Sequence, residues 1–346
     1  MKEVVLAAPI SNVVQLGDKI RNYSVDVFRF LGAIAIVVLH TIDSTDFPPL
    51  FYLFLKISTR WAVPFFFLIS GYFFEQDYRS YPEKALSKRL KNLIGVFISA
   101  TIIYFFINLY IGYPLSSTLS LYALTAGNYF HLWFIGSMIF GYLTMWFILE
   151  QQLKQITLIC IIVSFVLLIL ATGSYASILG LSGLDIRFAR HLAAVPFLLI
   201  GFLCARNKIT GTISWPVAAL LALLGLGIQI AETFYLQIQF GLDPVSHDIL
   251  IGTFLFSFSI FCLSMAIIKI KDNILTRWGR NYSLLIYLYH PILIGSRHTN
   301  LHFFIGDYSL GWMRPIGIFS LCLLLIIMIH RFLPLFFRFA NGTVWK

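Results

Sequence analysis

The chain has 346 residues, of which 59% are hydrophobic and 12% are charged. Soluble domains carry about 25% charged residues, so this composition excludes an ordinary soluble domain and indicates a membrane protein. The formal net charge is +10, but the lysines and arginines are spread along the chain and form no single dense stripe. This distribution argues against nucleic-acid binding.

Residues 1–24 are expected to form a cytoplasmic lead-in that is not a signal peptide. Glu3 interrupts its start, and its apolar run VVLAAPI is short. Asp18 and Lys19 then separate that run from the first long apolar stretch. A secretory signal needs a positively charged start and a longer apolar region.

About ten apolar stretches follow, and most are near the 20 residues that a helix needs to cross a bilayer. They are expected at residues 25–44, 52–74, 91–111, 131–149, 155–172, 189–205, 213–235, 248–268, 281–297 and 312–335. Asn281 and Ser283 are expected to cap the ninth helix, and Pro291 is expected to interrupt it. The sequence thus predicts an all-α polytopic protein, with one membrane domain at 25–338 and a cytoplasmic tail at 339–346.

The positive charges predict the orientation of this domain. With the N-terminus inside, eighteen of the 25 Lys and Arg residues fall in inner segments. Only six fall in outer segments: Lys56, Arg60, Arg187, Arg190, Arg297 and Arg314. Inner loops are the ones enriched in Lys and Arg, so both termini are expected in the cytoplasm.

Arg29 and His40 bracket an uncharged run in SVDVFRFLGAIAIVVLHT. On a helix they lie about 16 Å apart along the axis, which places Arg29 near the inner face and His40 in the outer half. Asp26 can form an ion pair with Arg29, and Asp43 can orient the His40 ring. Ionisable groups inside a membrane usually mark function. In the simpler alternative, Arg29 snorkels to the interface and His40 caps the helix end.

Other polar groups are expected on the same outer side. They are His131 and Trp133 in the fourth stretch, Arg187 and Arg190 before the sixth, and Tyr287 and His290 in the ninth. Tryptophan and tyrosine at a boundary are often interfacial anchors, whereas histidines that converge on one leaflet favour a site. None of the histidines has the short spacing typical of zinc ligands, so no metal is expected.

The densest inner cluster of cations contains Lys88, Arg89 and Lys91. Such a patch can hold the phosphates of a soluble cofactor, and it can equally bind lipid headgroups. The sequence has no Gly-rich phosphate loop, no nucleophile elbow and no HExxH pattern. Nucleotidases, serine hydrolases and zinc proteases are therefore disfavoured.

These residues resemble the acyltransferase 3 family of integral-membrane acyltransferases over nearly the whole chain. RNYSVDVFRFLGAIAIVVLH is similar to the opening motif of that family, and WAVPFFFLISGYFF is similar to its second-helix signature. KRLK resembles its cytoplasmic pair of basic residues. FHLWFIGSMIFGYL and GRNYSLLIYLYHP resemble two later signatures. Some members of the family carry an extra esterase-like domain outside the membrane, and this sequence shows none.

The resemblance implies transfer of an acyl group, commonly acetyl from acetyl-CoA, to an extracytoplasmic glycan at the bacterial inner membrane. It implies that His40 is a catalytic base or a transient acyl carrier, and that Arg29 supports acyl-CoA binding. Lys88 and Lys91 would hold CoA phosphates, where the family more often has arginine. We expect Arg89 to assist them, and His131, Arg190 or Tyr287 to stabilise the oxyanion.

Two alternatives remain open at this stage. In a proton-coupled transporter of small, amino-acid-like molecules, Arg29, His40 and Asp43 would form the binding site, although the repeat symmetry common in transporters is not evident. In a scaffold of a polysaccharide assembly machine, replacement of His40 by alanine would be harmless.

Overall fold

The computed structural model describes residues 22–181, 183, 186–267, 270–294 and 311–345. Within these ranges every regular element is helical. Several expected features lie outside the described residues: the lead-in up to residue 21, residues 268 and 295–297 of the eighth and ninth stretches, and residue 346 of the tail.

The longer helices correspond in order to the expected stretches. They are α1 (Tyr23–Thr41), α2 (Pro49–Ser58), α3 (Ala62–Ser80), α4 (Pro82–Tyr110), α7 (Trp133–Glu150), α8 (Gln155–Thr172), α10 (Ala194–Arg206), α11 (Trp215–Phe240), α12 (Ile251–Ala266), α13 (Ile274–Ile294) and α14 (Arg314–Phe332). Short helices connect or extend them: α5 (Leu115–Thr118), α6 (Leu121–Ala126), α9 (Ile186–Leu192), η1 (Ile209–Gly211), η3 (Gly311–Met313), α15 (Pro334–Ala340) and η4 (Thr343–Trp345).

Eight helical segments of the described chain are long and apolar enough to cross a membrane. They comprise α1, the α2–α3 segment, α4, α7, α8, the α9–α10 segment, α11, and the η3–α14 segment. The remaining two expected stretches correspond to α12, which is apolar but shorter, and to α13. The protein is therefore an all-α, multi-pass membrane protein, as the sequence predicted.

Proline explains why the second stretch is two helices. Pro64 lies in the first turn of α3. It has no backbone N–H for the carbonyl of residue 60, so the helical ladder is interrupted there. The chain turns at residues 59–61, and the Thr59 hydroxyl donates to the carbonyl of Leu55 at 2.9 Å. The break places a short outer helix, α2, beside the end of α1.

The ninth stretch differs from its prediction. Helix α13 begins at Ile274, where Asn273 and Thr276 exchange hydrogen bonds between side chain and backbone in a capping arrangement. Asn281 and Ser283 consequently lie inside the helix, so their prediction as caps was wrong. Pro291 does not end the helix, which continues to Ile294.

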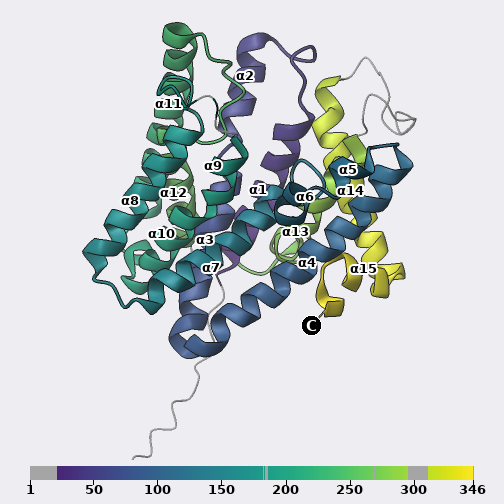
Figure 1. Ribbon diagram of the computed structural model, residues 1–346, viewed down its shortest axis with the longest axis horizontal. Coiled ribbons are helices and arrows are strands. Elements are labelled where there is room, and N and C mark those ends of the chain that lie inside the picture. Colours follow the sequence, from purple (N-terminus) through teal and green to yellow (C-terminus); the bar gives the residue numbers. More distant parts are fainter. Residues whose placement is uncertain (1–21, 182, 184–185, 268–269, 295–310, 346) are drawn as a thin grey trace, which may run out of the picture.

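Figure 1 shows α1 near the centre of the bundle, with α8, α11 and α12 on one side and α14 and α15 on the other, while α4 crosses obliquely. The most extensive helix pairs are α11 with α12, α3 with α10, and α1 with α13. The α1–α13 pair depends on Gly279. A Cβ atom there would lie 1.8 Å from the carbonyl oxygen of Asp26, so only glycine permits this backbone approach.

Candidate active site

Helix α1 carries both Arg29 and His40 without interruption. The eleven steps between them correspond to a rise of about 16 Å. Arg29 therefore lies toward the N-terminal end of α1, and His40 lies in the last turn of α1. His40 is partly exposed and, among the described residues, makes no side-chain hydrogen bond.

His40 lies in a cluster of aromatic and imidazole rings at the C-terminal end of α1. Its ring centroid is 5.6 Å from that of His290, with the planes inclined by 23°, and 5.2 Å from that of Phe130. The centroid of His131 is 6.0 Å from that of His290. Tyr287 packs against His131 at 5.5 Å. Three histidines that the sequence singled out thus come from α1, α13 and the segment before α7.

Backbone carbonyls next to this cluster bind its side chains. The Leu288 carbonyl accepts hydrogen bonds from Tyr104 Oη at 2.7 Å and from His131 Nε2 at 2.9 Å. The Tyr287 hydroxyl donates in turn to the carbonyl of His131.

These hydrogen bonds define the tautomers of two histidines. A carbonyl can only accept, so His131 Nε2 and His290 Nδ1, which is 2.9 Å from the Ile286 carbonyl, must each carry a hydrogen. In the neutral rings the opposite nitrogens, His131 Nδ1 and His290 Nε2, then hold bare lone pairs. Both are buried, and neither has a hydrogen-bond partner in the described part of the chain.

Lys56 is a cation close to His40. From the sequence, Lys56 was used only as one of the positive charges that predict the orientation. Its ammonium donates to the carbonyl of Leu39 at 2.6 Å and lies 5.5 Å from the centroid of Tyr52. Asp43 caps the turn after α1: its Oδ1 accepts from the N–H and the hydroxyl of Thr45, each at 3.0 Å.

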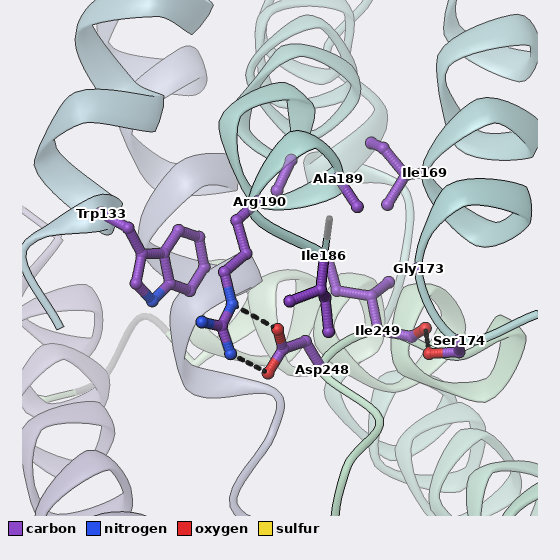
Figure 2. Close-up of a pocket in the computed structure, with 10 residues that line it drawn as sticks. Trp133, Ile169, Gly173, Ser174, Ile186, Ala189, Arg190, Asp248 and Ile249 are labelled. Atoms are coloured by element: carbon purple, nitrogen blue, oxygen red, sulfur yellow. Dashed lines mark hydrogen bonds and ion pairs between the residues drawn. The ribbon is translucent and has the colours of Figure 1, made fainter. Parts of the chain in front are cut away.

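A second pocket adjoins this cluster. Arg190 of α9 and Asp248, just before α12, form a two-pronged ion pair with N–O distances of 2.6 and 3.2 Å. The guanidinium lies 5.6 Å from the ring centroid of Trp133. Figure 2 shows these three side chains along a small cavity of about 20 Å³, whose other walls include Ile169, Ser174 and Ile249. The Arg190–Asp248 ion pair and the Trp133 ring thus lie together beside the histidine cluster.

Arg187 does not line that pocket. It is exposed on α9 and lies 4.7 Å from the ring centroid of Tyr122. Its backbone carbonyl is 2.8 Å from His191 Nδ1.

Near the N-terminal end of α1, a buried carboxylate lies between two arginines. Asp26 accepts from Arg29 at 3.3 Å and lies 4.0 Å from Arg280 of α13. Arg29 lies 5.4 Å from the ring centroid of Phe73. Asp26 is 2% exposed. A buried carboxylate needs such partners, and this one leaves part of each guanidinium accessible, since both arginine side chains are close to 30% exposed.

A basic groove lies beside it, between the end of α3 and the start of α4. Asp77 pairs with Lys88 at 3.2 Å and with Arg89, and Arg89 also donates to the Phe73 carbonyl at 3.2 Å. The groove is open, has a volume of about 240 Å³, and is lined by Asp77, Tyr81, Lys84, Ala85 and Lys88. Lys91 is exposed and does not line it.

Four contributors were absent from the site that the sequence predicted. Asp77 and Asp248 are the acidic partners of predicted cations, and Arg280 and Lys56 had been read only as topology signals. A weak signal existed for each, because a charge beside a long apolar run is costly. Within the described residues, no group of three or more His, Cys, Asp or Glu side chains is arranged to hold a metal ion.

Comparison with known proteins gives two kinds of match. A 310-residue alignment, 29% identical, covers 80% of this chain and 42% of a serine/alanine racemase of Enterococcus gallinarum. An alignment of 141 residues, 33% identical, covers 38% of this chain and 19% of an amino-acid racemase of Enterococcus faecalis. The chain spans less than half the length of these curated relatives. No solved structure matches it.

The match to a protein family also covers most of the chain. The family model for the acyltransferase domain of the acyltransferase 3 family covers residues 22–331, from the start of α1 almost to the end of α14. It includes Arg29, His40, the basic groove and the histidine cluster. The chain therefore belongs to the acyltransferase 3 family and is a multi-pass membrane acyltransferase.

Proposed function

We propose that this protein transfers an acyl group, acetyl in the first instance, from cytoplasmic acyl-CoA to a hydroxyl of a cell-surface or lipid-linked glycan. The observation that carries the proposal is the arrangement along α1. Arg29 stands beside a cation-lined groove, and His40 stands about 16 Å away in a cluster of imidazoles. A bacterial inner membrane, with the groove facing the cytoplasm, is the setting that fits the positive charges.

The basic groove suits the phosphates of CoA. Lys84 and Lys88 line it, and Arg89 lies at its edge with one N–H, at Nε, that has no partner within the described structure. Arg29 and Arg280 lie next along the path toward His40, on α1 and α13. Lys91, in an exposed position, would contribute long-range attraction only.

In the outer half, His40 is the group that meets the acyl carbon, either as the base for the attacking hydroxyl or as an acyl carrier. Lys56 is the donor best placed for the oxyanion. It uses one N–H on Leu39, the residue before His40, and an ammonium has three. His131 and Tyr287, by contrast, already donate to backbone carbonyls.

The acceptor would enter from the outer pocket of Trp133, Arg190 and Asp248. An indole face suits the apolar face of a sugar ring, and a guanidinium–carboxylate pair offers both donors and acceptors to neighbouring hydroxyls.

The test uses labelled acyl donor. Membranes that contain the protein should move label from [¹⁴C]acetyl-CoA into glycan, and membranes with His40→Ala at equal expression should not. Label that never leaves acetyl-CoA in the presence of native membranes would contradict the proposal.

A second candidate is a transporter for a small amino acid. It is favoured by one observation: a protein named as a serine/alanine racemase shares 29% identity with 80% of this chain. Uptake of labelled serine or alanine into vesicles, without consumption of acetyl-CoA, would distinguish this candidate.

A further inference from the structure

We propose that His290 is a second catalytic residue of this site, which takes the proton of the acceptor hydroxyl through Nε2 while His40 carries the acyl group. The inference rests on the proposed function and deepens it. It assigns separate roles to two histidines and chooses the two-step route over direct transfer.

The tautomer of His290 fits it for this role. Its Nδ1–H is held by the Ile286 carbonyl at 2.9 Å, which fixes both the ring orientation and the position of the hydrogen. The bare Nε2 is completely buried, and no described residue donates a hydrogen bond to it. A buried acceptor without a partner destabilises the protein, and a hydroxyl group of a substrate would supply the missing donor.

His40 is suited to the other role. Its ring is partly exposed and, among the described residues, makes ring contacts with Phe130 and His290 but no side-chain hydrogen bond. Neither nitrogen is therefore committed to a carbonyl, so one can attack while the other releases a proton. His290 could not do the same without losing its bond to Ile286.

In the first step, one ring nitrogen of His40 attacks the thioester carbonyl carbon. The C–S bond breaks, and CoA leaves as the thiol with the proton from the other ring nitrogen. In the second step, the acceptor oxygen attacks the acyl carbon as its proton passes to His290 Nε2. The C–N bond then breaks, and the departing His40 nitrogen recovers a proton from His290, which restores both neutral rings.

The separation of the two rings matches these steps. An O–H···N hydrogen bond places the hydroxyl oxygen about 2.8 Å from Nε2, and the two ring centroids are 5.6 Å apart. A hydroxyl bound to His290 is then within reach of an acyl group on His40. His131 packs edge-on against His290 with an inclination of 63° and supports its orientation.

Two replacements of His290 separate its nitrogens. In His290→Asn the side-chain amide can still donate to Ile286 from near the position of Nδ1, but nothing replaces Nε2. In His290→Gln the amide reaches the position of Nε2 without its basicity. His330→Asn serves as the matched control, because His330 is an exposed histidine of α14 that bonds Tyr282 at 2.9 Å, away from the site.

The experiment incubates each purified, detergent-solubilised protein with [¹⁴C]acetyl-CoA, measures the label bound to the protein and its sensitivity to hydroxylamine, and then adds native membrane vesicles as acceptor. We expect His290→Asn and His290→Gln to take up label as the wild type does. They should discharge it to glycan about 10²–10⁴-fold more slowly. His40→Asn should take up no label, and His330→Asn should match the wild type.

Three results would overturn the inference: discharge by His290→Asn at the wild-type rate, failure of the folded His290 variants to take up label, or glycan labelling by a wild type that never becomes labelled itself. A wild type that neither releases CoA nor labels glycan would instead overturn the proposed function, and this inference with it. Melting temperatures of all variants establish that each is folded.

Discussion

His40 and His290 stack with ring centroids 5.6 Å apart and a plane angle of 23°, although they come from α1 and α13 at opposite ends of the chain. Their meeting depends on a contact at the other end of the same two helices. Gly279 lets α13 touch the backbone of α1 at Asp26, and the two helices then run in the same direction to the histidines. The arginine pair Arg29 and Arg280 and the histidine pair are thus mounted on one helix pair.

Replacement of Lys56 should affect the chemical step. Lys56→Met removes an ammonium that is hydrogen-bonded at 2.6 Å to the carbonyl preceding His40. Loss of one oxyanion donor lowers kcat by about 10²–10³-fold. We expect this fall in steady-state acetyl transfer with an unchanged KM for acetyl-CoA, partial activity in Lys56→Arg, and no change in Lys271→Met. If only the KM for acetyl-CoA rose, Lys56 would contribute to donor binding and not to the chemical step.

Replacement of the groove cations should affect donor binding. In the double variant Lys88→Ala and Arg89→Ala, two partners of Asp77 are lost, and these are two of the cations that we propose hold the CoA phosphates. Hydrogen bonds to charged groups contribute about 1.5–3 kcal/mol each, so KM for acetyl-CoA should rise by about tenfold or more. Lys154→Ala, an exposed lysine at the start of α8, is the control. An unchanged KM would place the CoA phosphates elsewhere.

Replacement of Asp248 should affect the acceptor. Asp248→Asn keeps the shape of the side chain but removes the charge that holds Arg190 in place at 2.6 Å. We expect KM for the glycan to rise several-fold, with KM for acetyl-CoA unchanged, and Trp133→Ala to act in the same direction. Arg314→Gln, on the same side of the protein, should leave both constants alone. If Asp248→Asn or Trp133→Ala changed only the KM for acetyl-CoA, the pocket of Trp133, Arg190 and Asp248 would not be the acceptor site.

Replacement of Gly279 should affect the whole site through packing. In Gly279→Ala the new methyl group would lie 1.8 Å from the carbonyl oxygen of Asp26, so α1 and α13 must separate. Overpacking of this kind costs about 1–3 kcal/mol. We expect a lower melting temperature in detergent and weaker transfer. Gly317→Ala in α14 meets no atom within 4 Å and should be neutral or stabilising; equal effects at both glycines would contradict the packing role of Gly279.

The sequence predicted the helical membrane architecture well, because uncharged apolar runs of about 20 residues are rare outside membrane-spanning helices. The presence of Arg29 and His40 on one helix also followed from their spacing in the sequence. The sequence did not predict the start of α13. Residues 274–280 contain two arginines, so this segment does not stand out as an apolar run. The Asn273–Thr276 cap that begins the helix is a local signal that a search for apolar runs passes over.

The composition of the site was harder to predict than its location. Three histidines were visible in the sequence, but which of them touch depends on the packing of α1 against α13 at Gly279, which is a tertiary effect. The partners Asp77 and Asp248 lie far along the chain from Arg89 and Arg190 or on another helix. Only the packing of the helices brings such charges together.

The most direct test of the account is the acetyl content of cell-surface glycan, released with mild base, in a deletion strain that carries either the wild-type gene or His40→Ala. Expression and membrane insertion of both proteins are measured in parallel. We expect the wild type to restore the released acetate, and we expect that fully inserted His40→Ala does not restore it. Restoration by His40→Ala would show that His40 is structural and would contradict the mechanism.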